Sequence, residues 1–364
     1  MSLRGYGMKA LVFYGPGDIR YEKDWPGPGE PGDGEVTVAI SWCAICGTDI
    51  EDYRHGGIIP TERPHPTSGR MAPMVFGHEF VGRVAKTGKN VKRLVPGQKV
   101  AVECVAGCGK CYWCERKEYA LCPGMISIGQ YTDGGMAEYV NVPGENCIPL
   151  PDDADEQLFV TAEPFAVAVR AVRLGRVRMG ETVAVVGAGT IGLCGIAAAR
   201  IAGAERIISV NRGGHRAEVA KRVGATHCVN TTEQGWRDRY DELTNGVGAD
   251  MVLDTGGNIP AIQLAYEITR RQGRCVVASV VNQDLPLSVI DLIMTSKEVI
   301  GTNAHTWCEE FKWAVQYILD GRFDPTPLIT GKTYIENAFE EGIQRSIKDR
   351  NQIKILVTPH EGWV

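Results

Sequence analysis

The sequence predicts an α/β protein with two parts, a β-rich part interrupted by many glycines and prolines and a doubly wound parallel sheet. Three observations lead to this fold class. Short apolar runs separated by Gly and Pro fill residues 9–150, and from about Ala162 apolar runs alternate with segments of helical period. A glycine-rich turn follows the first of the later runs. A chain of 364 residues is long enough for two or three domains.

The composition excludes several classes of protein. Lys and Arg total 39 against 44 Asp and Glu, and no basic run stands out, so we expect no nucleic-acid partner. Residues 182–199 carry no charge, but glycines interrupt them, and a buried strand, turn and helix explain them better than a membrane span. The N-terminus lacks a basic segment followed by an apolar one, so we expect a cytoplasmic protein without a secretory signal.

The first part is expected to be mainly β-structure. Strands are predicted at residues 9–14, 19–22, 36–40, 80–84, 98–103 and 137–142. Residues 58–73 hold four prolines and almost no apolar periodicity, which predicts a surface loop. A loop of this length inside a compact domain is more often functional or mobile than decorative.

The second part alternates strands with helices. Strands are predicted at residues 182–187, 206–211, 227–230, 250–254, 274–279 and 298–301, with helices at 190–202, 215–223, 234–244, 260–271 and 287–295. Helices of this length between strands require right-handed parallel crossovers, so a doubly wound sheet is expected. A helix near 306–320 and short β-like segments close the chain.

The turn VAVVGAGTIG matches a dinucleotide-binding pattern. Its glycines are Gly187, Gly189 and Gly192, and it follows a predicted buried strand and opens a predicted helix, which is the context that the motif requires. Gly187 permits the tight turn, Gly189 lets the backbone approach the pyrophosphate, and Gly192 lets helix and strand pack closely. With Thr190 and Ile191, these residues form the candidate cofactor site at a helix N-terminus.

The end of the second predicted strand bears on the choice of cofactor. An NAD site usually has Asp or Glu there to accept hydrogen bonds from the ribose, but this chain has Asn211, with Arg212 and Arg216 following. A neutral residue does not repel a 2′-phosphate, and arginines can pair with one. This favours NADP, or tolerance of both cofactors; the alternative is that Asn211 holds the ribose of NAD while the arginines are solvated.

Four of the twelve cysteines form a compact motif. Cys108, Cys111, Cys114 and Cys122 have the spacing C-x2-C-x2-C-x7-C, and in a reducing compartment such clusters are better explained as metal ligands than as disulfides. Pro123 after the last cysteine is also found in iron–sulfur runs, but the last gap is too long for those. Four thiolates closing on one ion predict a structural zinc site.

A second constellation is spread along the chain: Cys46 lies in CGTD at 46–49, and His78 and Glu79 lie in GHE at 77–79. Together with the four-cysteine segment CGKCYWCERKEYALC and with GAGTIG at 187–192, they resemble the zinc-dependent medium-chain alcohol dehydrogenases over nearly the whole chain. PHPTSGRMAPMVFGHEF (64–80) and AEPFAVAVRAV (162–172) are most similar to the branch of (R,R)-butanediol and sorbitol dehydrogenases.

The resemblance implies a GroES-like zinc-binding catalytic domain at residues 1–162 and 303–364 and a Rossmann domain at 163–302. It implies two Zn²⁺ ions per chain, one structural and one catalytic. The catalytic ion would be held by Cys46 and His78 and by Glu163 or Glu79, of which we favour Glu163; the alternative for Glu163 is a charge at a helix N-terminus.

The family's motif also carries roles for two polar neighbours of Cys46. Thr48 matches the hydroxyl residue that passes on the substrate proton, and Asp49 matches the carboxylate that orients the ligand histidine. Glu51 departs from relatives that have a His there, which puts the proton exit in doubt and argues against threonine as substrate.

The implied function is NAD(P)-linked hydride transfer between a secondary alcohol, such as a vicinal diol or polyol, and its ketone. The expected partners are this small molecule and further copies of the chain in a homodimer or homotetramer, with no membrane. Two alternatives stay open: a zinc-free quinone or enone reductase of the same superfamily, and a non-catalytic zinc- or nucleotide-binding protein. Cys46, His78 and the four clustered cysteines argue against the first.

Overall fold

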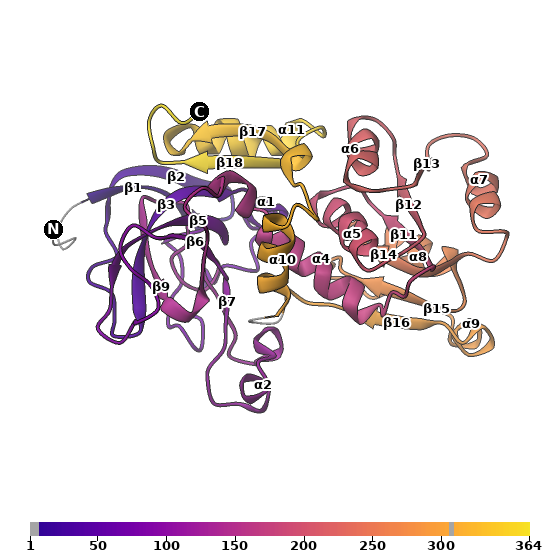
Figure 1. Ribbon diagram of the computed structural model, residues 1–364, viewed down its shortest axis with the longest axis horizontal. Coiled ribbons are helices and arrows are strands. Elements are labelled where there is room, and N and C mark those ends of the chain that lie inside the picture. The colour runs from indigo at the N-terminus through magenta and orange to yellow at the C-terminus, as the bar shows by residue number, and fades with distance from the viewer. Residues whose placement is uncertain (1–6, 306–308) are drawn as a thin grey trace. The chain divides into compact units, whose positions relative to one another are not determined.

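The computed structural model describes residues 7–305 and 309–364, which form two compact units (Figure 1). The first unit contains residues 7–163, 309–320 and 329–364, and the second contains residues 164–305 and 321–328. The helix expected near 306–320 is present as α10 (Glu310–Leu319), whereas residues 306–308, with Cys308, lie outside the described residues.

The first unit is built mainly from antiparallel strands. Its largest sheet has the order β10 (Cys147–Pro149), β6 (Lys99–Val102), β5 (Glu79–Thr87), β3 (Glu35–Ala44), β18 (Lys354–Thr358) and β17 (Ile329–Tyr334), with β9 (Tyr139–Pro143) also paired to β3. Smaller sheets join β2 (Asp18–Pro26), β1 (Gly7–Gly15) and β4 (Met74–Val75), and β7 (Val105–Ala106) with β8 (Ile126–Ser127). Residues 58–73 contain no helix or strand, in agreement with the predicted loop.

Helical segments of the first unit are short. They are α1 (Gly47–His55), α2 (Tyr112–Glu115), α3 (Glu156–Phe159), α11 (Arg345–Lys348), and the turns η1 (Tyr119–Leu121), η2 (Gly144–Asn146), η4 (Ile335–Asn337) and η5 (Ala338–Gln344). Because β3 has neighbours on both sides and most of its residues are buried, the point where it ends at Ala44 is fixed. Helix α1 begins three residues later, so the end of β3 also fixes where α1 starts.

The second unit holds a six-stranded sheet whose strands all run parallel. Its order is β13 (His227–Asn230), β12 (Arg206–Asn211), β11 (Thr182–Val186), β14 (Ala249–Asp254), β15 (Thr269–Val277) and β16 (Glu298–Gly301). The helices are α4 (Ala162–Leu174), which starts at the border of the units, α5 (Thr190–Ile201), α6 (His215–Val223), α7 (Trp236–Leu243), α8 (Ile259–Ile268) and α9 (Val289–Thr295), with the turn η3 (Thr326–Leu328). This confirms the doubly wound sheet, whose order reverses between β11 and β14.

Two details differ from the sequence-based expectation. The helix predicted at 260–271 ends at Ile268, because the next residue, Thr269, already pairs with Ala249 at the start of β14. Residues 270–273 belong to β15 but lie in a register shift, and the pairing resumes where Arg274 meets Met251. Tertiary pairing here overrides local propensity. Residues 321–328 lie in the second unit instead of the first, and Phe323 packs against Phe165 of the second unit with ring centroids 4.1 Å apart and the rings tilted.

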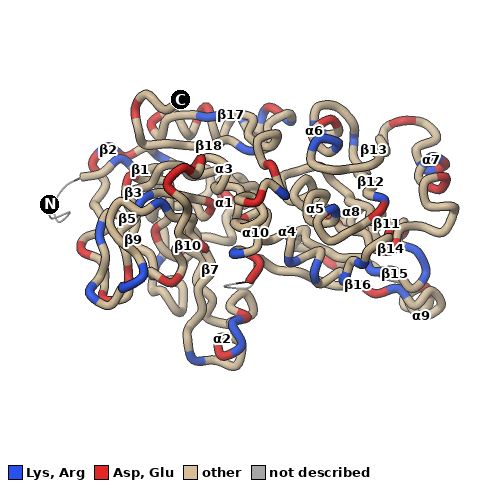
Figure 2. The backbone as a smooth tube through the Cα atoms, viewed as in Figure 1, with Lys and Arg blue, Asp and Glu red and all other residues tan. Residues whose placement is uncertain are grey.

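Charge is spread evenly over the described chain. Lys and Arg alternate with Asp and Glu along the elements of both units, as Figure 2 shows. No helix among residues 7–305 and 309–364 has the length and apolar character needed to cross a membrane.

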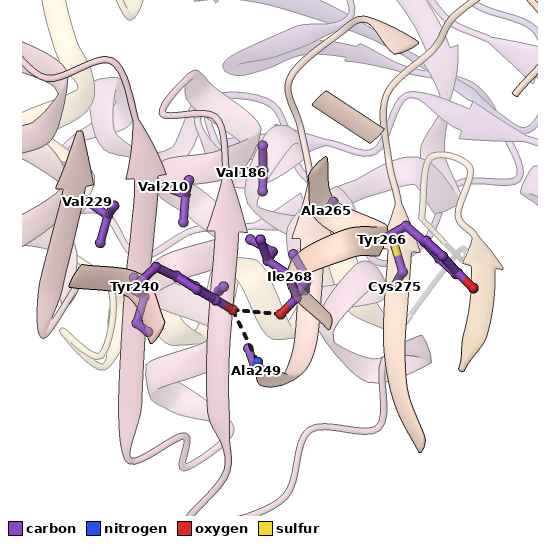
Figure 3. Close-up of a cluster of buried hydrophobic side chains, with 12 residues drawn as sticks. Val186, Val210, Val229, Tyr240, Ala249, Ala265, Tyr266, Ile268 and Cys275 are labelled. Atoms are coloured by element: carbon purple, nitrogen blue, oxygen red, sulfur yellow. Dashed lines mark hydrogen bonds between the residues drawn. The ribbon is translucent and has the colours of Figure 1, made fainter. Parts of the chain in front are cut away.

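Tyr240 anchors the core of the second unit (Figure 3). It is fully buried among apolar side chains of the sheet and α8, and its hydroxyl donates to the Ile268 carbonyl at 2.8 Å and accepts from the Ala249 N–H at 3.2 Å. The hydroxyl therefore joins the end of α8 to the start of β14.

We predict that Tyr240→Phe lowers the free energy of unfolding by about 1–3 kcal/mol, because two buried backbone groups lose their partner. Urea unfolding measures the change. Tyr266→Phe is the matched control, since its hydroxyl bonds Asp291 near the surface and its loss should cost less. Equal effects of the two substitutions would show that the Tyr240 hydroxyl does not join these elements.

Candidate active site and metal centres

Four cysteines converge in the lobe between β7 and β8. Their Sγ atoms all lie within 4.8 Å of one another, with 3.6 Å between Cys111 and Cys114, 3.6 Å between Cys111 and Cys122, and 3.9 Å between Cys108 and Cys114. All four are free thiols. Zinc–sulfur bonds of about 2.3 Å in a tetrahedron hold the sulfurs about 3.8 Å apart, so this spacing fits one zinc ion.

The ionisation of these thiols also fits a cation. The backbone N–H of Lys110 and the Cys122 side chain lower the pKa of Cys108 to about 7. Burial acts in the other direction on Cys114 and raises its pKa to about 12. Sulfurs this close cannot all ionise without a positive charge among them, and a divalent ion supplies it.

The register of two strands brings the second constellation together. In the antiparallel pair β3–β5, Ala44 lies opposite Glu79. Cys46 follows β3 as the N-cap of α1, and His78 immediately precedes β5. The Cys46 Sγ, a ring nitrogen of His78 and a carboxylate oxygen of Glu79 consequently lie within 4.8 Å of one another.

Asp49 links the first two of these residues. One of its oxygens accepts the Cys46 N–H at 2.9 Å, and the other lies 3.6 Å from the His78 Nδ1, which is buried and has no hydrogen-bond partner among the described residues. Burial lowers the pKa of His78, but the negative charges of Cys46, Asp49 and Glu163 outweigh it and raise the pKa well above its ordinary value. The buried ring therefore lies among acidic groups, which favour a cation.

Glu79 has a counter-ion that the sequence patterns did not reveal. Lys354, on β18, donates to both carboxylate oxygens at 2.8 and 2.6 Å and to the Ile45 carbonyl at 3.2 Å, and both charged side chains are buried. Burial raises the pKa of Glu79, and Lys354 opposes that shift. Burial would lower the pKa of Lys354, but Glu79 raises it.

Glu163 lies in the first turn of α4, also buried, and its Oε1 accepts from the Cys104 thiol at 3.6 Å. Its charge acts on the pKa values of His78, Glu79 and Lys354, so it lies near these groups, but it is not part of the compact set around Cys46. Two glutamates, Asp49 and a thiol thus lie near one another with one lysine. A divalent cation fits this excess of acidic groups.

Two further residues of α1 were singled out from the sequence, and the structure places them differently. Thr48 is half-buried, and the Gln130 side-chain amide donates to its Oγ1 at 3.4 Å. Glu51, in contrast, is exposed and pairs with Arg54 on the surface at 3.6 Å. Gln130 was not singled out from the sequence, because 82 residues separate it from Thr48 and no local motif marks it.

The glycine-rich turn joins β11 to α5 in the second unit. Gly187 has a φ of 98°, which favours glycine, and a Cβ on Gly192 would stand 2.1 Å from the Gly187 carbonyl oxygen. Helix and strand can approach only without that side chain. A Cβ on Gly189 would meet no atom closer than 4.0 Å, so the space beside this residue is free. Thr190 and Ile191 then begin the twelve-residue helix α5, and its N-terminus lies next to this free space.

Asn211 holds the next turn through its own side chain. Its Oδ1 accepts the Gly213 N–H at 2.7 Å and its Nδ2 donates to the Ser209 hydroxyl at 2.9 Å. Arg212 is exposed, whereas Arg216 reaches toward the glycine turn: a Cβ on Gly189 would lie 4.0 Å from its Nη1. A guanidinium, with no carboxylate beside it at Asn211, therefore lies at the edge of the turn.

Comparison with known proteins places these features in one family. Residues 32–152 match the model of the alcohol dehydrogenase GroES-like domain, and residues 190–320 match that of the zinc-binding dehydrogenases. The chain is 31% identical to (R,R)-butanediol dehydrogenase of Bacillus subtilis over 97% of its own length and 100% of the relative. It is 29% identical to sorbitol dehydrogenase of the same organism, over 97% and 98%.

A solved structure extends the likeness to the fold. A zinc-binding dehydrogenase of Sinorhizobium meliloti bound to NADP is 26% identical, with a TM-score of 0.86 over 97% of this chain and 99% of that one. Together with the GroES-like and parallel-sheet units, these matches show that the chain belongs to the zinc-type medium-chain alcohol and polyol dehydrogenases, a family of oxidoreductases.

Proposed function

We propose that this protein interconverts a secondary alcohol, with a vicinal diol or polyol as the preferred class, and the corresponding ketone by hydride transfer to and from NAD(P). The convergence of Cys46, His78 and Glu79 within 4.8 Å is the observation that carries the proposal. Thr48 follows Cys46 by two residues in the chain. The names of the butanediol and sorbitol relatives support the substrate class.

We propose that Cys46, His78 and a glutamate hold a catalytic zinc ion, and that Cys108, Cys111, Cys114 and Cys122 hold a structural one. A bound catalytic zinc supplies Lewis-acid polarisation of the substrate oxygen, which lowers the pKa of the alcohol. The third ligand is one of two glutamates. Glu79 is favoured because it belongs to the compact set with Cys46 and His78. Glu163 is favoured because Glu79 is already paired with Lys354.

The remaining roles belong to the chain's own polar groups. Asp49 orients both ligands, since it accepts the Cys46 N–H and faces the His78 ring. Thr48 takes the substrate proton at Oγ1 and passes its own proton to solvent water. Glu51 is turned to the surface with Arg54, so a relay through that position is not part of the proposal.

We further propose that the glycine turn and α5 bind the cofactor pyrophosphate and that Arg216 pairs with the 2′-phosphate of NADP. Asn211 adds no repulsion there, and its side chain keeps the turn that carries Arg216 in place. NAD stays a possible cofactor, because Arg212 is solvated.

We propose a homodimer formed through the edge of the second unit's sheet. Within the described chain β16 pairs only with β15, so its other edge is open. The adjoining α9 exposes Val289, Ile290, Ile293 and Met294, each at least 64% exposed. A second copy related by a twofold axis covers this apolar helix, and its own β16 pairs antiparallel with β16 of the first copy. The unpaired strand edge and the exposed apolar surface are then both buried.

Metal content tests the proposed function. We expect about two zinc ions per wild-type chain, and about one in Cys46→Ser, which loses turnover while cofactor binding persists because the glycine turn is untouched. Cys111→Ser should also lose one ion but act through stability, with a lower melting temperature. Elemental analysis, cofactor fluorescence and turnover of a vicinal diol give the three readouts.

The same measurements distinguish the alternatives. Turnover without zinc would identify a zinc-free reductase, and one ion without turnover a structural zinc protein. Glu79→Gln and Glu163→Gln compare the two carboxylates: the ligand is the one whose loss releases the catalytic ion. Full zinc content and normal activity in Cys46→Ser would refute the assignment.

The cofactor proposal predicts that NADP is used at least as well as NAD. Asn211→Asp with Arg216→Ser should shift the ratio of kcat/KM for NADP over NAD roughly ten- to a hundredfold toward NAD, because a charge-assisted bond is lost and a repulsion gained. Arg222→Ser on the same helix is the control. A preference for NAD above about tenfold in the unmodified enzyme contradicts the role of Arg216.

The dimer proposal predicts that Ile290→Asp with Ile293→Asp gives a monomer, because two charges then lie in the buried face. Light scattering after size-exclusion chromatography measures the mass. Met179→Asp alters an isolated exposed apolar residue of the same unit and should leave the dimer intact. A monomeric wild type, or a double variant that stays dimeric, would overturn the proposed interface.

A further inference from the structure

Residues 128–135, IGQYTDGG, lie directly against the backbone of the motif that contains His78. The N–H groups of Gly134 and Gly135 donate to the carbonyls of Val75 at 2.9 Å and Gly77 at 2.8 Å. A Cβ on Gly129 would stand 2.2 Å from the Gly77 carbonyl oxygen, so only glycine permits this approach. We call residues 128–135 the capping loop.

The capping loop is also held from its other side, by the loop 58–73. The Ser68 hydroxyl donates to the Tyr131 carbonyl at 2.5 Å, and the rings of His65 and Tyr131 stack with centroids 4.3 Å apart. Asp133 pairs with Arg70 and accepts the Val75 N–H at 3.0 Å. With anchors on both sides, the residue between Gly129 and Tyr131 has a fixed position.

That residue is Gln130, whose Nε2 donates to the Thr48 Oγ1 at 3.4 Å. A threonine hydroxyl has one proton to donate and two lone pairs to accept with. Gln130 occupies one lone pair, which leaves the second lone pair and the proton to other partners. The amide has no ionisable proton, so Gln130 can orient the hydroxyl but cannot relay a proton itself.

We propose that Gln130 is a positioning residue for the reaction: its amide N–H fixes the Thr48 hydroxyl so that the free lone pair faces the substrate O–H. The substrate proton then arrives at Oγ1 as the Thr48 proton passes to solvent water, and Gln130 gains and loses no proton. This inference rests on the proposed function, and it assigns to the capping loop a role in the chemistry in addition to its packing against Gly77.

The first test replaces the donor. Gln130→Met keeps the length of the side chain but removes the N–H, and kcat should fall about three- to tenfold while KM changes less than about twofold, the cost of one hydrogen bond. The kcat of Gln130→Glu should fall further, because the carboxylate accepts a hydrogen bond from the Thr48 hydroxyl and so turns the Thr48 proton away from the proton path. Zinc content, melting temperature and NADPH fluorescence should stay unchanged in both.

Gln234→Glu is the matched control for the added charge, since Gln234 is exposed on the second unit, and it should leave kcat unchanged. If Gln130→Glu keeps wild-type kcat, the amide oxygen and not the N–H faces Thr48, and the proposal is wrong. If Gln130→Met binds less zinc or has a lower melting temperature, Gln130 is a packing residue, and this result would also overturn the proposal.

A double-mutant cycle separates this inference from the function on which it rests. If Gln130 acts through Thr48, then adding Gln130→Met to Thr48→Val costs no further kcat, whereas independent effects multiply. If the losses of kcat of the two single variants multiply in the double variant, the inference about Gln130 is wrong but the proposed function stands. The same holds if Gln130→Met has normal kcat while Thr48→Val is impaired. A Thr48→Val enzyme with normal kcat instead refutes the proton path of the proposed function.

Discussion

The antiparallel register of β3 and β5 is the constraint on which the candidate site depends. Ala44 lies opposite Glu79, so the chain that leaves β3 at Cys46 meets the chain that enters β5 at His78. In a β-ladder a slip of one residue turns every side chain to the opposite face. A slip here would point Glu79 away from Lys354 and would separate the thiol from the imidazole. The burial of β3 between its neighbours protects that register.

The ion pair between Glu79 and Lys354 follows from the same register. A buried carboxylate needs a counter-charge, and a lysine has three protons to place. Two of them go to Glu79 and one to the Ile45 carbonyl, so the lysine is fully satisfied. An ionised carboxylate has about four lone-pair positions. Glu79 can therefore keep Lys354 and still offer a position to a metal ion, which reconciles its ion pair with its place in the compact set around Cys46.

Sequence reasoning succeeded where the physics is local. The spacing of the four cysteines and the glycine pattern after β11 each lie within one short segment, and the parallel sheet follows from the alternation of strands and helices. It failed where partners are distant. Lys354 is 275 residues from Glu79, and nothing in a predominantly apolar strand indicates that its lysine points inward to a carboxylate. The early end of α8 has the same cause, since Thr269, the residue after the helix, pairs with Ala249 on β14, a contact that local propensity does not reveal.

Asn211 has a structural role that the local sequence pattern did not reveal. The absence of a carboxylate at the end of β12 is visible in the sequence, but the structure gives the side chain a second task, since it bonds both Ser209 and Gly213. Asn differs from Asp in charge and in its N–H donors. Both can accept the Gly213 N–H, and the Ser209 hydroxyl can accept from the amide of Asn or donate to the carboxylate of Asp. The turn can therefore change its charge without changing its shape. This separates the geometry of the cofactor site from its electrostatics, so that Arg216, beside the glycine turn, can act on a phosphate without any rearrangement of β12 or α5.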